Sequence, residues 1–245
     1  MSEPSYEELI ASYIADALSG CRNVSVGTAA PLHAMGALLA SARTGGRMAV
    51  GMLGSARDNF YHNGGHEMFD AAASGRIDGF MLGGGQVDGV GNINLWGRGE
   101  YPNYTVRWPG NFGSPLMYSV TRKVVLVIEE HTTRKLPDRV DFISAAGSSP
   151  QGAPRTGGPS ALVTSRCVFR FNRETRRFEL QSVHPDSSVE DVIANTGFKV
   201  ILPDVVPVTP QPTKDDLSFL RGPVIDRLRS PYPLFAARLE AQASA

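Results

Sequence analysis

The segment from Leu82 to Trp96, LGGGQVDGVGNINLW, brings glycines and polar side chains together in one short stretch. Successive glycines let a ligand approach the backbone and expose N–H groups that can bind an oxyanion or a phosphate. The segment is not a dinucleotide-binding fingerprint, since no GxGxxG opens a helix, and it lacks the Gly-Lys-Ser/Thr of a Walker loop. A tight loop whose glycines take positive φ angles accounts for the pattern equally well. The residues predicted to form the polar wall of a site are Gly84, Gly85, Gln86, Asp88 and Asn92.

A second small, polar turn contains Gly113 and Ser114, within the sequence NFGSP. N–H groups or a hydroxyl at a helix start would suit an anion or an enolate oxygen, and an ordinary capped helix start is the alternative. Aromatic residues crowd the chain between this turn and the glycine-rich segment. They are Trp96, Tyr101, Tyr104, Trp108 and Phe112. Such side chains either wall an apolar pocket or pack the loop down.

His131 follows Glu129 and Glu130 at the end of an apolar strand segment. A cluster of this kind at the carboxyl end of a strand could perform acid–base chemistry. A salt bridge at an interface, with Arg134 or Arg139 as the partner, explains the same residues. The salt bridge is the interpretation that we favour.

Metal binding and serine hydrolase chemistry have little support in the sequence. His62 and His66 are four residues apart, but the glycine pair between them disfavours a continuous helix that presents both as ligands. No Gly-x-Ser-x-Gly motif is present. We therefore predict no metal site and no serine nucleophile.

The elements that must position these residues follow a strand–helix–strand pattern. NVSVG, a helical run from Pro31 to Arg43 and RMAVGML form a parallel βαβ unit. Ile77 to Leu82 is a further strand, which places the glycine-rich segment at the carboxyl edge of the sheet, where ligand sites of α/β proteins concentrate. The continuous apolar run of KVVLVIEE is typical of a buried, central parallel strand.

The last third of the chain has a different texture. Residues 148–160 form a turn-rich loop, and two alternating strands flank the turn at residues 172–175. Residues 222–245 resemble an extended arm. Helices are predicted at residues 6–18, 31–43, 66–73, 115–121, 187–197 and 214–221. The sequence thus predicts one α/β domain over residues 1–245, with an open, mostly parallel sheet flanked by helices and an antiparallel hairpin in the C-terminal third.

Composition sets the class of protein. The 24 Lys and Arg residues balance the 24 Asp and Glu residues, so no positive field favours nucleic acid or an anionic membrane. No uncharged stretch is apolar enough for a transmembrane helix, and the N-terminus lacks the pattern of a signal peptide. The only cysteines are Cys21 and Cys167, which fits a reducing compartment. We therefore expect a cytoplasmic protein without nucleic-acid or membrane partners.

Several segments together resemble the β subunit of family I coenzyme A transferases, of the glutaconate and 3-oxoacid type. The matching segments are NVSVGTAAP, FMLGGGQVDGVGNINLW, EEHTTRKLPDRVDFISAAG and NTGFKVILPDVVPVTPQPTKDDLSFLR. They occur in the family's order and cover most of the chain from about residue 20 to 221. The resemblance implies the transferase-type α/β fold and an α-subunit partner.

One position departs from the family. The transferases carry a nucleophilic glutamate just after the second strand, where this chain has Leu53, Gly54, Ser55 and Ala56. That carboxylate forms the acyl anhydride and then holds CoA as a glutamyl thioester. Ordinary CoA transfer by this chain is therefore disfavoured.

Among relatives without that glutamate, the chain resembles the β subunit of the actinobacterial steroid ring-opening hydrolases. The resemblance implies an α2β2 heteromer that opens the last ring of a steroid-derived CoA thioester by retro-Claisen C–C cleavage in cholesterol catabolism. It places the catalytic glutamate on the α subunit and leaves this chain Gln86, Asp88 and Asn92 as supporting groups. The substrate-binding residues expected here are Gly84, Gly85, Gly113, Ser114, Trp96, Trp108 and Phe112. CoA is part of the substrate, and no separate cofactor is expected.

Two other functions remain open from the sequence. The chain could be the β subunit of a CoA transferase for a dicarboxylate or a 3-oxoacid, with a nucleophile at another position. It could also be a structural subunit that stabilises an active α chain without contributing chemistry.

Overall fold

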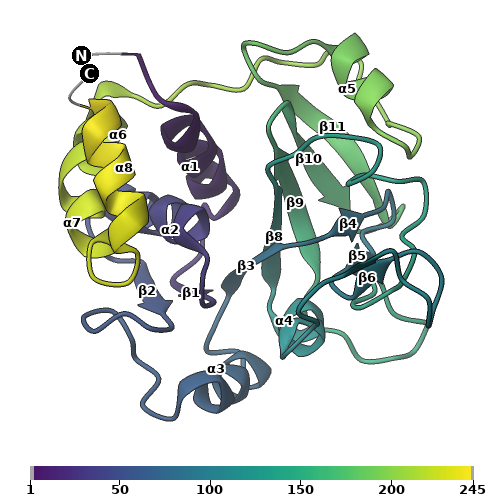
Figure 1. Ribbon diagram of the computed structural model, residues 1–245, viewed down its shortest axis with the longest axis horizontal. Helices are drawn as coiled ribbons and strands as arrows, with labels where there is room; N and C mark the ends of the chain where they lie inside the picture. The colour runs from purple at the N-terminus through teal and green to yellow at the C-terminus, as the bar shows by residue number, and fades with distance from the viewer. Residues whose placement is uncertain (1–2, 244–245) are drawn as a thin grey trace. The chain divides into compact units, whose positions relative to one another are not determined.

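The computed structural model describes residues 3–243, which divide into two compact units (Figure 1). Unit 1 comprises the described residues up to Met81 together with those from Pro210 onward, and unit 2 runs from Leu82 to Thr209. No helix in residues 3–243 is long and apolar enough to cross a membrane.

Unit 1 is built on the predicted βαβ unit. Strand β1 (Asn23–Val26) pairs in parallel with β2 (Ala49–Met52), and helix α2 (Pro31–Arg43) connects them. On its other side β1 pairs in parallel with β3 (Gly79–Gly83), the strand that leads into the glycine-rich segment. Helix α1 (Tyr6–Ala17) packs against α2, and α3 (Gly64–Ala73) precedes β3. The predicted parallel strands and crossover helix are therefore confirmed.

The C-terminal residues of unit 1 are helical, so the predicted extended arm at residues 222–245 is wrong over its described part. After α6 (Lys214–Phe219) the chain continues through a π-helical turn (Leu220–Val224) into α7 (Ile225–Leu228) and then α8 (Pro233–Ala243). Prolines in this stretch gave the appearance of an arm. Pro233, however, opens its helix, where a missing N–H costs nothing. Residues 244–245 lie outside the described residues.

Unit 2 contains both parallel and antiparallel strands. Strand β8 (Lys123–Ile128) pairs in parallel with β9 (Pro159–Thr164), and β10 (Cys167–Asn172) pairs antiparallel with both β9 and β11 (Arg177–Val183). The hairpin of β10 and β11 turns at residues 173–176, as predicted. The α/β class, with mostly parallel strands beside helices and antiparallel strands in the C-terminal third, is confirmed.

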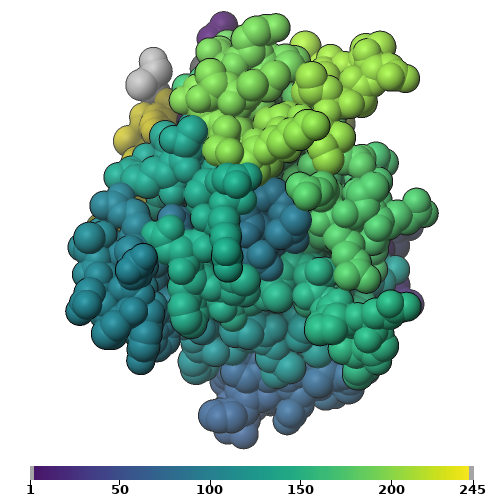
Figure 2. Space-filling model, turned by 90° about the vertical axis from the view of Figure 1, so that its right-hand side faces the viewer, coloured from purple at the N-terminus to yellow at the C-terminus, as the bar shows by residue number. Residues whose placement is uncertain are grey.

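Short elements complete unit 2. They are the ribbons β4 (Gln86–Val87) with β5 (Ile93–Asn94) and β6 (Gly97–Arg98) with β7 (Val106–Arg107), and the helices α4 (Ser114–Val120) and α5 (Val189–Asn195). The proline-rich stretch after α5 follows β11 through isolated bridges at Ile201 and Val208 and lies at the surface seen in Figure 2. Its prolines cannot donate to a ladder, which limits the pairing to single bridges.

Candidate active-site loop and the cavity beside it

The polar side chains of the glycine-rich segment point into the segment itself. The amide oxygen of Gln86 accepts hydrogen bonds from the Asn94 side chain at 2.7 Å and from the Asp141 N–H at 3.0 Å. The carboxylate of Asp88 accepts from the Asn92 N–H and from the Asn92 side-chain amide, both at 2.9 Å. Burial raises the pKa of Asp88, while the hydrogen bonds from Asn92 oppose that rise. These three predicted residues therefore fix the shape of the loop.

The two glycines at the start of the loop are required by close packing. A Cβ added at Gly85 would lie 2.1 Å from the Trp108 ring, and one at Gly84 would lie 2.9 Å from Ile93. Positive φ, the alternative explanation, applies in this loop to Gly91, at 77°. The Gly85 N–H donates to the Asn94 carbonyl at 2.9 Å. The hydrogen bonds inside the loop thus leave the Gly84 N–H as the candidate oxyanion donor of the pair.

A cavity of about 150 Å³ opens beside Gly85 and Trp108. The other residues lining it are Gln86, Arg98, Val106, Glu130, Arg134 and Lys135. Three of these side chains are cationic and one is anionic, so the cavity carries an excess of positive charge. The Lys135 ammonium lies 5.9 Å from the centre of the Trp108 ring. A basic cavity with one aromatic wall suits a ligand that carries both an anionic and an apolar part.

Glu130 and His131 separate at the end of β8. Glu130 forms an ion pair with Arg134, and that hydrogen bond lowers the pKa of the Glu130 carboxyl. His131 turns inward, where its Nδ1 lies 2.8 Å from the Thr164 hydroxyl and its Nε2 lies 2.9 Å from the Thr196 hydroxyl. Burial lowers the pKa of His131 to about 4. His131 is thus a neutral core residue, and the salt-bridge interpretation holds for Glu130 alone.

The second polar turn stands apart from this cavity. Gly113 precedes α4 without donating or accepting a side-chain cap, and Ser114 begins the helix. Neither residue is among those lining the cavity beside Gly85, and the same is true of Trp96 and Phe112.

The predicted aromatic residues have different surroundings. Trp96 is covered by the Arg107 guanidinium, 3.7 Å from the ring centre, and stacks with Phe142. Phe112, with φ of 44°, is 85% exposed. Of the predicted aromatic residues, Trp108 is therefore the one that the structure brings to the glycine loop.

Within residues 3–243, no group of three or more His, Cys, Asp or Glu side chains has the geometry to hold a metal ion. His62 and His66 are both exposed, and only His66 lies within α3.

The turn after β2, where the transferase nucleophile is expected, contains no carboxylate. Gly54 has a φ of 87°, and the buried Ser55 hydroxyl accepts hydrogen bonds from the N–H groups of Arg57 and Asp58 at 3.3 and 3.0 Å. Asp58 is the next carboxylate along the chain. Both of its oxygens accept hydrogen bonds from Arg227 of α7, at 2.9 and 3.2 Å. The sequence did not reveal this partner, because residues 222–245 were expected to be extended.

Comparisons with known proteins agree with this architecture. A family model described as coenzyme A transferase matches residues 7–195. One of the two subunits of the 3-oxoadipate CoA-transferase of Pseudomonas knackmussii is 33% identical over 154 residues, which are 60% of this chain and 59% of that protein. The cholesterol ring-cleaving hydrolase IpdB subunit of Rhodococcus jostii is 30% identical over 159 residues, 63% and 62% of the two chains. The matches thus span less than two thirds of these relatives' length.

Solved structures match over a larger part of the chain. Rhodococcus jostii RHA1 IpdAB has a TM-score of 0.78 at 26% identity, covering 94% of this chain and 99% of that one. Glutaconate coenzyme A-transferase from Acidaminococcus fermentans has a TM-score of 0.76 at 22% identity, over 90% and 94% of the two chains. The decarboxylase AibA/AibB has a TM-score of 0.75 at 21% identity, over 89% and 94%. The last two likenesses concern the fold alone.

Proposed function

The chain belongs to the coenzyme A transferase family, and we propose that it is the β subunit of a heteromeric hydrolase that opens the last ring of a steroid-derived CoA thioester. The likeness to the ring-cleaving IpdB subunits supports this substrate class. The turn after β2 supports the reaction type.

That turn is the observation that carries the proposal. Covalent CoA transfer needs an ionised, accessible carboxylate to attack the thioester carbonyl. The first carboxylate after the turn, Asp58, is buried and engaged by Arg227. Leu53, Gly54 and Ser55 offer no group that could hold CoA as an acyl thioester.

Hydrolytic ring opening needs no such group. A water molecule adds to a ring carbonyl carbon, the adjacent C–C bond breaks, and its electron pair forms an enolate that is then protonated at carbon. The step requires a base for the water and donors for the developing oxyanion. We assign the base to a glutamate of the α subunit and the Gly84 N–H to the oxyanion.

The cavity beside Gly85 fits the remaining role of this chain. Arg98 and Lys135 would hold an anionic part of the substrate, and Trp108 would contact an apolar part. The supporting groups Gln86, Asp88 and Asn92 would act by holding the loop, since their polar atoms already bond within unit 2. CoA enters as part of the substrate.

The proposed assembly is an α2β2 heteromer in the cytoplasm. Its support is that the relatives are named as subunits and that one solved relative is the complex IpdAB. A CoA-thioester substrate is consistent with a cytoplasmic location.

A CoA transferase for a 3-oxoacid is the second candidate, favoured by the 33% identity to a 3-oxoadipate CoA-transferase chain. It requires a nucleophilic carboxylate from outside the turn after β2. A glutamyl-CoA thioester, trapped as a mass increase or by inactivation with borohydride, would identify it.

The deciding experiment uses the chain co-expressed with its α partner and a CoA thioester that retains a cyclic β-diketone. In water labelled with ¹⁸O, ring opening places one ¹⁸O atom in the new carboxylate, whereas the α subunit alone should be inactive. Transfer of CoA to a carboxylate acceptor without that incorporation would contradict the proposal. An unchanged rate in Gly84→Val would instead favour a structural subunit.

A further inference from the structure

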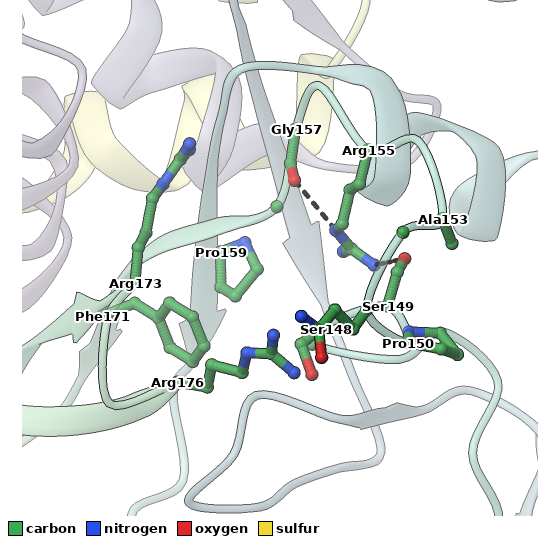
Figure 3. A pocket seen from close by; sticks show the side chains of 14 residues that line it. Ser148, Ser149, Pro150, Ala153, Arg155, Gly157, Pro159, Phe171, Arg173 and Arg176 are labelled. Atoms are coloured by element: carbon green, nitrogen blue, oxygen red, sulfur yellow. Dashed lines mark hydrogen bonds between the residues drawn. The ribbon is translucent and has the colours of Figure 1, made fainter.

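Unit 2 contains a second cavity, of about 320 Å³, away from the one beside Gly85 (Figure 3). Its walls are the loop from Gly147 to Pro159 and the hairpin turn between β10 and β11. The two cavities lie at opposite ends of β8. Glu130, just past the end of β8, lines the first, and Pro159, which pairs with Val124 near the start of β8, lines the second. Six residues of strand separate them by about 20 Å.

The second cavity is lined by Arg155, Arg173 and Arg176, and its described lining residues include no Asp or Glu. Arg155 donates to the carbonyls of Gly157 at 2.9 Å and Tyr118 at 3.1 Å. Within the part of the chain that the structure describes, none of the three arginines forms an ion pair. Three cations therefore share one concave surface without a neutralising partner, which is costly unless an anion binds there.

The arginines differ in how they are held. Arg173 lies at the rim and donates to the Arg122 carbonyl at 2.6 Å. Arg176 has no hydrogen bond among the described residues, and its φ of 55° is in the left-handed region. Burial and the nearby Arg173 lower the pKa of Arg155. Arg176 is thus the cation with the most donors left for a ligand.

Figure 3 shows Arg176 and Arg155 reaching from opposite walls toward Ser148 and Ser149. The Arg155 guanidinium lies 3.5 Å from the Ser149 hydroxyl. Phe171 and Pro159 lie side by side on the remaining wall. Guanidinium groups bind phosphate oxygens in pairs, serine hydroxyls add donors, and an apolar wall receives a ring.

We propose that this cavity is a binding site for an organic polyphosphate of the nucleotide type, with Arg155 and Arg176 on the phosphates. The ligand is either the 3′-phospho-ADP end of CoA or a free nucleotide. The chemistry of the site is the same for both, and the proposal does not depend on the ring-opening reaction.

The test measures binding of adenosine 3′,5′-bisphosphate, ATP and inorganic phosphate to the full chain by calorimetry, alone and with its α partner. Arg176→Asn removes the charge with a residue that tolerates positive φ, and Arg173→Gln removes the rim cation. Because hydrogen bonds to charged groups are strong, the double variant should bind nucleotide about tenfold or more weakly. Arg177→Gln is the matched control, since Arg177 adjoins Arg176 but does not line the cavity.

Competition separates the two sources. If CoA displaces adenosine 3′,5′-bisphosphate and dephospho-CoA does so poorly, the site holds the CoA end, and KM for the CoA thioester should rise in the double variant. If ATP binds and leaves KM unchanged, the site takes a free nucleotide. Absence of binding by all the phosphorylated probes, or equal binding by the double variant and wild type, would overturn the proposal. Neither result would bear on ring opening.

Discussion

Asp58 and Arg227, 169 residues apart in the sequence, are joined by two hydrogen bonds between a nearly buried carboxylate and a guanidinium. Asp58 follows the turn after β2, and Arg227 lies in α7. The contact therefore ties the C-terminal helices to the turn where relatives of the transferase type are expected to carry their nucleophile.

Replacing Arg227 with Met should destabilise the protein, because it leaves the Asp58 carboxylate buried without its partner. Breaking a buried pair costs about 3–5 kcal/mol, and the partial exposure of Arg227 reduces this to about 2–3 kcal/mol of unfolding free energy. Urea unfolding measures the effect. Arg229→Met, which removes an exposed ion pair with Glu240, is the control and should change stability little. Equal losses in both variants would argue against a special role for the Asp58 contact.

Leu53→Glu should abolish ring opening without creating CoA transfer. The new carboxylate would lie near the glutamate that we assign to the α subunit, and two like charges at close range raise one pKa and disturb the base. Leu53 is preferable to Gly54 for this test, because φ at Gly54 is 87° and disfavours any side chain. Both reactions are assayed on the co-expressed variant, and efficient acyl transfer would contradict our proposal.

Gly85→Ala should lose stability as well as activity, since the added Cβ would meet the Trp108 ring. Overpacking of this kind costs about 1–3 kcal/mol. Adding Trp108→Ala should recover part of the melting temperature, so the double variant should be less destabilised than the sum of the single ones. Additive losses would mean that Trp108 is not the obstacle. Gly84→Ala, with only Ile93 to displace, should lose activity chiefly.

Acid should weaken unit 2 through two buried histidines. Burial lowers the pKa of His131 and of His184 to about 4 each, so the unfolded chain takes up these protons at a higher pH than the folded one. Stability is therefore complete above about pH 6.5 and falls as the pH drops toward 4, by about 3 kcal/mol for each histidine. Urea unfolding between pH 7 and pH 4 measures the slope.

His131→Gln and His184→Gln should each flatten that pH dependence while lowering stability at neutral pH. His62→Gln serves as the control, because His62 is exposed and its replacement should leave the slope intact. A slope that is unchanged in the His131 and His184 variants would assign the acid sensitivity to other groups.

Local pattern was enough to predict most of the fold. The βαβ unit around α2, the strand β8 and the hairpin of β10 and β11 follow from apolar periodicity and turn residues, which are properties of neighbouring positions. The C-terminal helices were missed because α7 and α8 are short and lie among prolines. Burial of Leu228, Ala236 and Leu239 stabilises them, and burial depends on packing rather than on local sequence.

The site was predictable in composition but less so in geometry. The glycine loop and Trp108 were found from their residue types, and the structure places them beside one cavity. Lys135 and Arg98, which also line that cavity, carried no local signal because their proximity arises from tertiary contacts. Gln86 and Asp88 pointed to a ligand by type, whereas their polar atoms hold the loop together.

The contact between Asp58 and Arg227 also bears on how such a chain can change its chemistry over evolution. A single substitution that restored a carboxylate after β2 would appear in a turn already fixed by Ser55 and by a residue near the other end of the chain. The nucleophile and the C-terminal helix would have to change together. Loss of the glutamate is thus easier to acquire than to reverse, and within this family the identity of the residue paired with Asp58 should indicate which lineages have passed that point.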